Sequence, residues 1–270
     1  MEATLTFLGS GTSMAVPTLG CGCAVCTDAH RPGSPNRRTR PSILLAYNDK
    51  HVLIDTGQDF HHQAVRENIQ HLDAVLYTHG HADHVLGMDD LRPLSFKLAP
   101  HELPLYADAP TAEVLRRVFA YTFRTVDRYP TSARVKLHRI PAEPGFEIDL
   151  FGARFERVPV MHGRDTIAGY RFGAAAYLTD MSDIPDESLT LLEDLDILVL
   201  DALRRDPHPS HSHLSKSIDF VNQLKPRRAF FTHMSHDLDH AATETTLPPH
   251  IRLAYDGLQI NFEIAPEPIS

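Results

Sequence analysis

Apolar and polar positions alternate along the chain in short blocks, a pattern typical of an α/β protein with many strands. Strand-like blocks of the first half cover 4–8, 42–47, 51–55, 72–77 and 103–106, and those of the second half cover 146–149, 153–160, 166–172, 175–178, 197–200, 229–232 and 258–264. Helical spacing occurs at 58–68, 111–121, 189–195, 214–224 and 241–245. This pattern fits an αββα sandwich, in which two mixed β-sheets pack face to face with helices outside.

The length and composition predict a single domain. The chain has 270 residues, of which 42% are hydrophobic, and it shows no repeat or interdomain linker. We therefore expect a single domain over 1–270. No apolar run approaches the ~20 residues of a membrane helix, and no basic region precedes an apolar core at the N-terminus. These features predict a cytoplasmic protein without membrane contact, and a homodimer is among the oligomeric states they allow.

Four metal-competent side chains crowd into one short segment. His79, His81, Asp83 and His84 fall within six residues, directly after the apolar run 72–77. Two imidazoles two residues apart on an extended segment share one side and can bind one ion. The next pair diverges on a turn and can reach a second ion, and two-metal hydrolases separate their ions by ~3.5 to 4 Å. The alternative is a polar surface loop in a chain that holds 18 histidines.

This segment resembles the metal motif of the metallo-β-lactamase-fold hydrolases. The resemblance implies three further ligands at strand ends: His162 as the third histidine of the first ion, Asp180 as the carboxylate bridging both ions, and His233 on the second ion. Asp83 counts among the catalytic residues as well as the ligands. The seven implied ligands, five histidines and two aspartates, leave coordination positions of the two ions open for water. Open positions are typical of catalytic rather than structural metal sites.

All three cysteines lie in one loop, at Cys21, Cys23 and Cys26. A disulfide framework favours an even number spread through a secreted chain, whereas this spacing favours a zinc ion bound by thiolates. A tetrahedral structural zinc needs a fourth ligand, and His236, three residues after His233, is the candidate. The alternative is three free cysteines without a metal.

The cysteine loop narrows the resemblance to one branch. Together with the segments 7–13, 36–42 and 232–236, it is similar to the phosphoribosyl 1,2-cyclic phosphate phosphodiesterases of phosphonate breakdown and their relatives, over about 4–262. This implies a metal-dependent phosphodiesterase with two divalent ions, Zn or Mn, acting on a small, cyclic ribose phosphate.

Two alternatives remain within the superfamily. The tRNA 3′-end endonuclease ribonuclease Z resembles the chain at the metal motif but binds tRNA with a Gly- and Lys-rich arm. Such an arm is not visible here, because residues 88–144 contain no glycine and only two lysines. The formal net charge of −9 also disfavours long nucleic acids as partners. The other alternative is a non-hydrolytic accessory protein resembling the pyrroloquinoline quinone biosynthesis relative, and the complete ligand set argues against it.

A ribose alkoxide is a poor leaving group and needs a proton from a general acid. Residues 206–215 offer three histidines before a predicted helix, and the resemblance favours His213, with His211 second. Asp55 and Asp201 end apolar strands and resemble carboxylates that orient metal-bound imidazoles. Arginine binds phosphate oxygens with two parallel hydrogen bonds, so a phosphate contact and a solvated loop are both open for the basic run Arg31, Arg37, Arg38 and Arg40.

Overall fold

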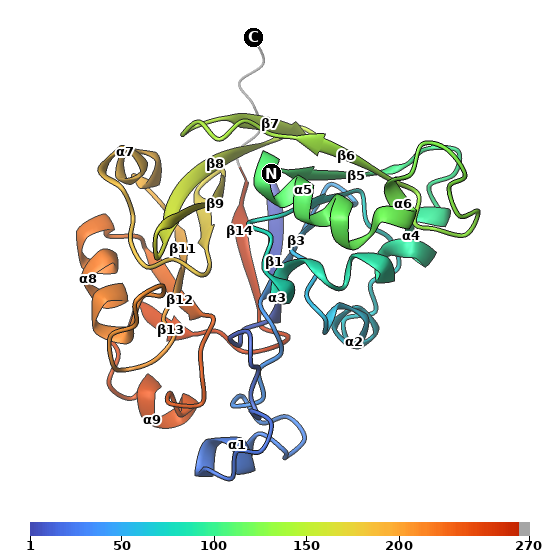
Figure 1. Cartoon of the computed structure of the whole chain (residues 1–270). Coiled ribbons are helices and arrows are strands. Elements are labelled where there is room, and N and C mark those ends of the chain that lie inside the picture. Colours follow the sequence, from blue (N-terminus) through green and yellow to red (C-terminus); the bar gives the residue numbers. More distant parts are fainter. Residues whose placement is uncertain (265–270) are drawn as a thin grey trace.

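Two seven-stranded sheets form the centre of the molecule. A computed structural model describes residues 1–264, so the last six residues of the predicted domain lie outside it. The first sheet has the order β14-β1-β2-β3-β4-β5-β6 and the second the order β13-β12-β11-β10-β9-β8-β7. Figure 1 shows the two sheets facing each other, with the helices on their outer sides. The predicted αββα sandwich of mixed sheets is confirmed.

The first sheet is antiparallel from β14 to β3 and parallel from β3 to β6. Its strands are β1 (Glu2–Gly9), β2 (Ser42–Tyr47), β3 (Lys50–Ile54), β4 (Ala74–Leu76), β5 (Leu103–Ala107), β6 (Val135–Arg139) and β14 (Gln259–Glu263). The helices on this side are α2 (Phe60–Arg66), α3 (Ala82–Val85), α4 (Arg92–Phe96), α5 (Ala109–Val118) and α6 (Ala120–Phe123), with a 3₁₀ turn at Met88–Leu91.

The second sheet is antiparallel from β7 to β10 and parallel from β10 to β13. Its strands are β7 (Glu147–Leu150), β8 (Ala153–His162), β9 (Asp165–Phe172), β10 (Ala175–Leu178), β11 (Ile197–Asp201), β12 (Arg228–Thr232) and β13 (Ile251–Leu253). The helices beside it are α7 (Asp186–Leu189), α8 (Leu214–Leu224) and α9 (His240–Glu244), with a 3₁₀ turn at Thr190–Leu192.

Three apolar clusters hold these four layers together. One fills the space between the sheets, and the other two lie between each sheet and its helices. The inner strands β10 and β11 are buried on both faces, whereas the edge strand β14 alternates between buried and exposed residues. None of the helices within residues 1–264 is long and apolar enough to cross a membrane.

Local structure departs from the sequence pattern in several places, among them the helix predicted over 111–121, which is interrupted at Phe119 between α5 and α6. The predicted helix at 189–195 is wrong in extent: α7 begins after Pro185, and a 3₁₀ turn follows it and ends before Asp194, which has a φ of 56°. Leu192 and Leu195 are buried without being helical. The sequence analysis also missed β6 and β13, because β6 is a polar edge strand and β13 has only three residues.

Candidate metal centre

The predicted ligands converge because they follow neighbouring strands. His79 and His81 lie in the loop after β4, and Asp83 and His84 in the short helix α3. His162 ends β8, while Asp180 follows β10 and His233 follows β12. The ends of parallel strands meet at one edge of a sheet, so loops far apart in the sequence reach the same place. The structure therefore brings all seven predicted ligands together.

These residues form two groups that Asp180 connects. The ligand atoms of His79, His81 and His162 lie within 4.8 Å of one another, and so do those of Asp83, His84, Asp180 and His233. The two carboxylate oxygens of Asp180 lie 3.2 Å from Nε2 of His84 and 3.2 Å from Nε2 of His233. Oδ2 of Asp180 also lies 3.8 Å from Nε2 of His79, in the first group. The Asp180 carboxylate thus lies within reach of both groups.

Hydrogen bonds fix which imidazole nitrogen faces the site. Nδ1 of His84 donates to Oδ2 of Asp55 over 2.7 Å, and Nδ1 of His162 donates to the carbonyl oxygen of Ser210 over 2.8 Å. A nitrogen that donates to oxygen carries the proton, so Nε2 of a neutral ring has the free lone pair. Each Nε2 is therefore ready to bind a metal, with its orientation set by the group behind it. Asp55 thus lies behind His84, where a carboxylate that orients this imidazole would stand.

Buried polar atoms without partners provide the test of fit for metal ions. Within residues 1–264, Nε2 of His79, His84 and His233 and Oδ2 of Asp83 are buried and have no hydrogen-bond partner. A buried polar atom without a partner is costly, and metal coordination satisfies such atoms. The His/Asp cluster is consistent with a dinuclear metal site.

The buried carboxylates of the cluster create a negative potential that favours cations. Burial would lower the pKa of His84, but the carboxylates of Asp180, Asp83 and Asp55 outweigh burial and raise it well above its usual value. Burial would also lower the pKa of His233, but the charges of Asp180 and Asp201 outweigh burial and raise this pKa to about 9. Buried carboxylates thus hold protons on neighbouring imidazoles, and a divalent ion would satisfy the same carboxylates while displacing those protons.

Three residues of the site have left-handed backbone conformations. The φ angles of Asp55, Asp180 and His233 are 67°, 56° and 57°. Non-glycine residues seldom adopt this region, although Asp, Asn and His do so more readily than others, and such strain clusters at functional sites. In each case the residue follows a strand, so the turn aims its side chain across the sheet edge rather than onward along the strand.

His211 lies at the metal centre, whereas His213 lies beside it. Nδ1 of His211 donates to Oδ2 of Asp201 over 2.8 Å, and the His211 ring centroid is 4.7 Å from those of both His162 and His233. His213 directly precedes α8 and makes no capping hydrogen bond with its side chain. The structure thus brings the second choice, His211, to the ligands and pairs it with Asp201.

The ionisation of this pair follows from its burial. Burial, followed by the charge of His233, lowers the pKa of His211 to about 4. Burial raises the pKa of Asp201 well above its usual value, against the charge of His233.

A separate cluster joins the cysteine loop to His236. Nδ1 of His236 lies 3.2 Å from Sγ of Cys21, 3.7 Å from Sγ of Cys23 and 3.3 Å from Sγ of Cys26. All four ligand atoms lie within 4.8 Å of one another, a spacing that could hold a structural metal. Burial raises the pKa of Cys26 to about 11, so a metal would bind there with release of a proton.

The basic run does not form one phosphate site. The buried guanidinium of Arg38 donates to the carbonyl oxygens of Ser235 and Leu238, over 2.8 Å each. Arg40 pairs with Asp59 at 3.2 Å, and Arg31 pairs with Asp28. Arg37 is exposed and lines a cavity with Arg66, His62 and Tyr255. Most of these arginines therefore fasten the loop that carries the cysteines.

Two cavities open beside the metal ligands. One of about 400 Å³ adjoins His79, His81 and His162 and is walled by the start of α5 and by residues 165–167. A Cβ atom on Gly80 would come within 2.9 Å of the Val114 side chain, so glycine lets α5 approach the metal motif closely. The other cavity, of about 520 Å³, adjoins His211 on the side of α8.

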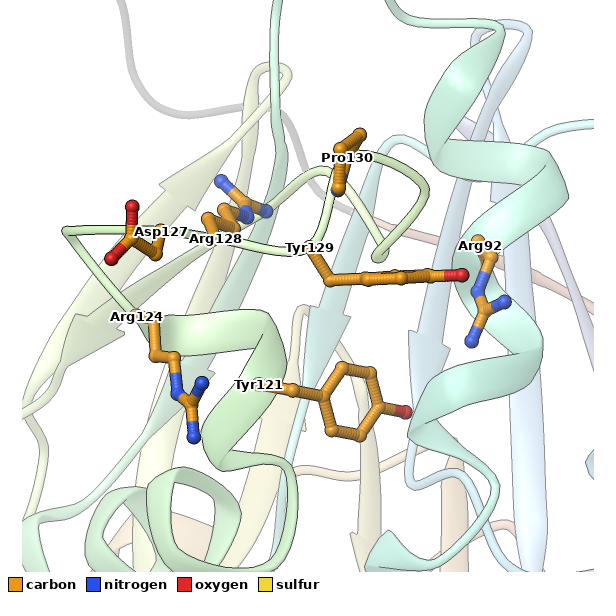
Figure 2. Close-up of a pocket in the computed structure, with 7 residues that line it drawn as sticks. All are labelled: Arg92, Tyr121, Arg124, Asp127, Arg128, Tyr129 and Pro130. Carbon is orange, nitrogen blue, oxygen red and sulfur yellow. The ribbon is translucent and has the colours of Figure 1, made fainter.

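A further pocket lies apart from this centre. Figure 2 shows Tyr121 and Tyr129 extending toward Arg92, beside the loop after α6. Arg92 is paired with Asp89, and Arg128 is paired with Glu102 at 3.1 Å. This pocket shares no residue with the metal groups or with the two cavities beside them.

Comparisons with known proteins place the chain in a family. Residues 50–234 match the model of the Beta-lactamase superfamily domain. The crystal structure of a new diphosphatase from the PhnP family is 52% identical, covers 98% of both chains and has a TM-score of 0.90. Zn²⁺-bound PqqB from Methylobacterium extorquens is similar in fold, with a TM-score of 0.74, 18% identity and coverage of 95% and 99%.

Among curated proteins, an octanoyltransferase of Porphyromonas gingivalis is 40% identical over 93% of this chain and 50% of its own length. A ribonuclease Z of Methanococcus maripaludis is 26% identical over 57% of this chain and 47% of its own length. The chain thus spans about half the length of these curated relatives. The family match and the near full-length structural likeness agree: the chain belongs to the β-lactamase superfamily and, within it, to the PhnP family.

Proposed function

We propose that this protein is a two-metal phosphohydrolase that cleaves a P–O bond in a small phosphodiester or diphosphate, including cyclic ribose phosphates of the phosphoribosyl 1,2-cyclic phosphate type. The observation that carries the proposal is the convergence of two ligand groups sharing Asp180 with the His211–Asp201 pair at one strand edge. A diphosphatase of the PhnP family at 52% identity supports this substrate class. Both substrates present a phosphorus between two bridging oxygens.

The ligands would hold two divalent ions, Zn or Mn, and such ions supply an activated water and neutralise charge that builds on phosphate. The chain's own contribution beyond them is proton transfer. Asp201 accepts a hydrogen bond from Nδ1 of His211. This bond fixes the orientation of the ring and leaves Nε2 free to carry the transferred proton. His211 also lines the cavity beside α8, where a leaving group has room. We assign the role of general acid to His211 in place of the predicted His213.

Small substrates fit the cavities better than RNA does. The two cavities beside the ligands measure about 400 and 520 Å³, the range of small-molecule sites. The net charge of −9 weakens attraction to a polyanion. The ribonuclease Z and PqqB likenesses show the shared fold. The complete set of seven ligands supports hydrolysis over an accessory role.

Replacing His211 by alanine should slow hydrolysis of 2′,3′-cyclic AMP by ~10² to 10⁴ while largely sparing bis-p-nitrophenyl phosphate. A ribose alkoxide needs a proton as it leaves, and p-nitrophenolate scarcely does. The measurement is kcat on both substrates with metal-reconstituted protein, and His101→Ala on an exposed turn is the control. Equal losses on both substrates would assign His211 to binding, and a leaving-group-dependent loss confined to His213→Ala would return the role to His213.

A substrate panel tests the function itself. Metal-loaded protein should turn over bis-p-nitrophenyl phosphate and at least one small cyclic ribose phosphate or diphosphate. Cleavage of pre-tRNA should be absent in the same preparation. Turnover of pre-tRNA alone would favour the nuclease alternative, and no turnover by fully metallated protein would favour the accessory alternative.

A further inference from the structure

The cavity of about 520 Å³ beside α8 has polar lining residues besides His211 to which the proposed function gives no role. His208, His211 and His213 line it together with Lys216, Asp183 and Ser182. Its walls come from the β8–β9 turn, the segment before α8 and the first turn of α8. His211 belongs both to this cavity and to the metal centre. The cavity is therefore where a group attached to the leaving oxygen would lie.

The cavity presents hydrogen-bond donors and one fixed positive charge. Nδ1 of His208 accepts from the backbone N–H of Ser210 over 3.3 Å, so in the neutral ring Nε2 carries the proton and is a donor. The Lys216 ammonium is held 3.2 Å from Oδ2 of Asp183. With side-chain exposures of 35% for Lys216 and 57% for Asp183, this is a surface ion pair of low intrinsic strength. An incoming phosphate can compete with Asp183 for the ammonium.

A general acid and an anion pocket serve different leaving groups. An alkoxide requires protonation, whereas a departing phosphate already spreads its charge over several oxygens and is stabilised by cations and hydrogen-bond donors. A neutral sugar or alcohol would gain little from Lys216. We propose that this cavity is a leaving-group subsite that holds the departing phosphate of those proposed substrates that contain a P–O–P bridge. This inference rests on the proposed function.

The reaction then balances as hydrolysis of an anhydride. The oxygen of one water molecule forms a bond to the phosphorus at the metal centre, and the bond from that phosphorus to the bridging oxygen breaks. The electron pair leaves with the second phosphate, which lies beside Lys216 and His213. Nε2 of His211 takes a proton from the attacking water and passes it to the bridging oxygen of the departing phosphate. One water is consumed and two phosphate monoesters form.

The inference is tested with two probes that differ in the leaving group. With di(adenosine-5′) diphosphate the leaving group is AMP, whereas with bis-p-nitrophenyl phosphate it is p-nitrophenolate, which carries no phosphate. Lys216→Gln and His213→Ala should each lower kcat/KM on the diphosphate about tenfold, the typical loss of one charge-assisted hydrogen bond, with most of the change in KM. Both variants should stay within about twofold of the parent on the phenolate substrate.

Two further variants make the test specific. Lys225→Gln removes the same charge at the opposite end of α8 and should change neither activity. Asp183→Asn removes the competing carboxylate and should lower KM for the diphosphate, an effect opposite in sign to that of Lys216→Gln. Melting temperatures equal to the parent's show that the variants fold.

The outcomes separate this inference from the function beneath it. Equal losses on both probes, no loss on the diphosphate, or a parent enzyme that cleaves only the phenolate substrate would overturn the subsite while leaving a phosphohydrolase. A metallated parent that cleaves neither probe, nor any cyclic ribose phosphate, would overturn the proposed function.

Discussion

Replacing Asp180 by asparagine should lower turnover of bis-p-nitrophenyl phosphate roughly a thousandfold, because transition-state charge stabilisation at a two-metal site is worth several kcal/mol. Asp180 is the residue whose carboxylate reaches both ligand groups, so its charge organises both halves of the site. Asparagine has nearly the same shape and also tolerates the φ of 56° found there. The substitution thus removes charge with little backbone cost.

The measurement combines kcat with elemental analysis after reconstitution. The parent should hold two ions at the His/Asp cluster, and the variant should hold fewer or bind them more weakly. Asp194→Asn is a matched control, because Asp194 is exposed, lies outside the site and has the same φ of 56°. Activity near the parent's in Asp180→Asn, or a parent that hydrolyses diesters with fewer than two tightly held ions, would contradict the dinuclear mechanism.

The second large effect concerns stability. Cys23→Ser should remove one zinc ion per chain and lower the melting temperature by roughly 5 °C or more, because a closed thiolate site contributes folding free energy. Cys23 is exposed, so serine at this position creates neither a cavity nor a buried polar group. Any large loss of stability therefore reports the metal rather than side-chain packing.

Calorimetry and zinc analysis on the same preparations decide the matter. Thr27→Ala in α1 (Ala24–Asp28), an exposed position of the same loop, should keep both the zinc and the melting temperature. Unchanged stability in Cys23→Ser combined with lost catalysis would refute the structural role.

The sequence was sufficient to predict which residues converge as candidate metal ligands, because they follow strands whose apolar runs are visible. His162, Asp180 and His233 all fall at such ends, where local spacing and the family resemblance agree. The choice between His211 and His213 could not be made this way. It depends on Ser212, which donates from its backbone to the carbonyl of Met181 and shares a 2.7 Å hydrogen bond with Ser217. Contacts of this kind have no signature in local spacing.

The arginine run illustrates the opposite difficulty. A cluster of like charges suggests a shared ligand, yet Arg38 points inward and binds backbone carbonyls near His236. Arg40 is held by Asp59, so the neighbouring arginines face different partners. Lys216, in contrast, carries no motif and became a candidate only when the fold placed it around one cavity with His208 and His213. Side-chain direction in irregular segments is a tertiary property, and composition does not encode it.

The two ligand groups also constrain how this protein can be made. His79, His81, Asp83 and His84 precede β5, whereas Asp180 and His233 belong to the second sheet. A chain emerging from the ribosome therefore exposes four ligands long before their partners exist, and contacts this distant in sequence form slowly. Tight retention of both ions should then appear only when the two sheets have docked, so metal capture would mark the completion of folding rather than its start.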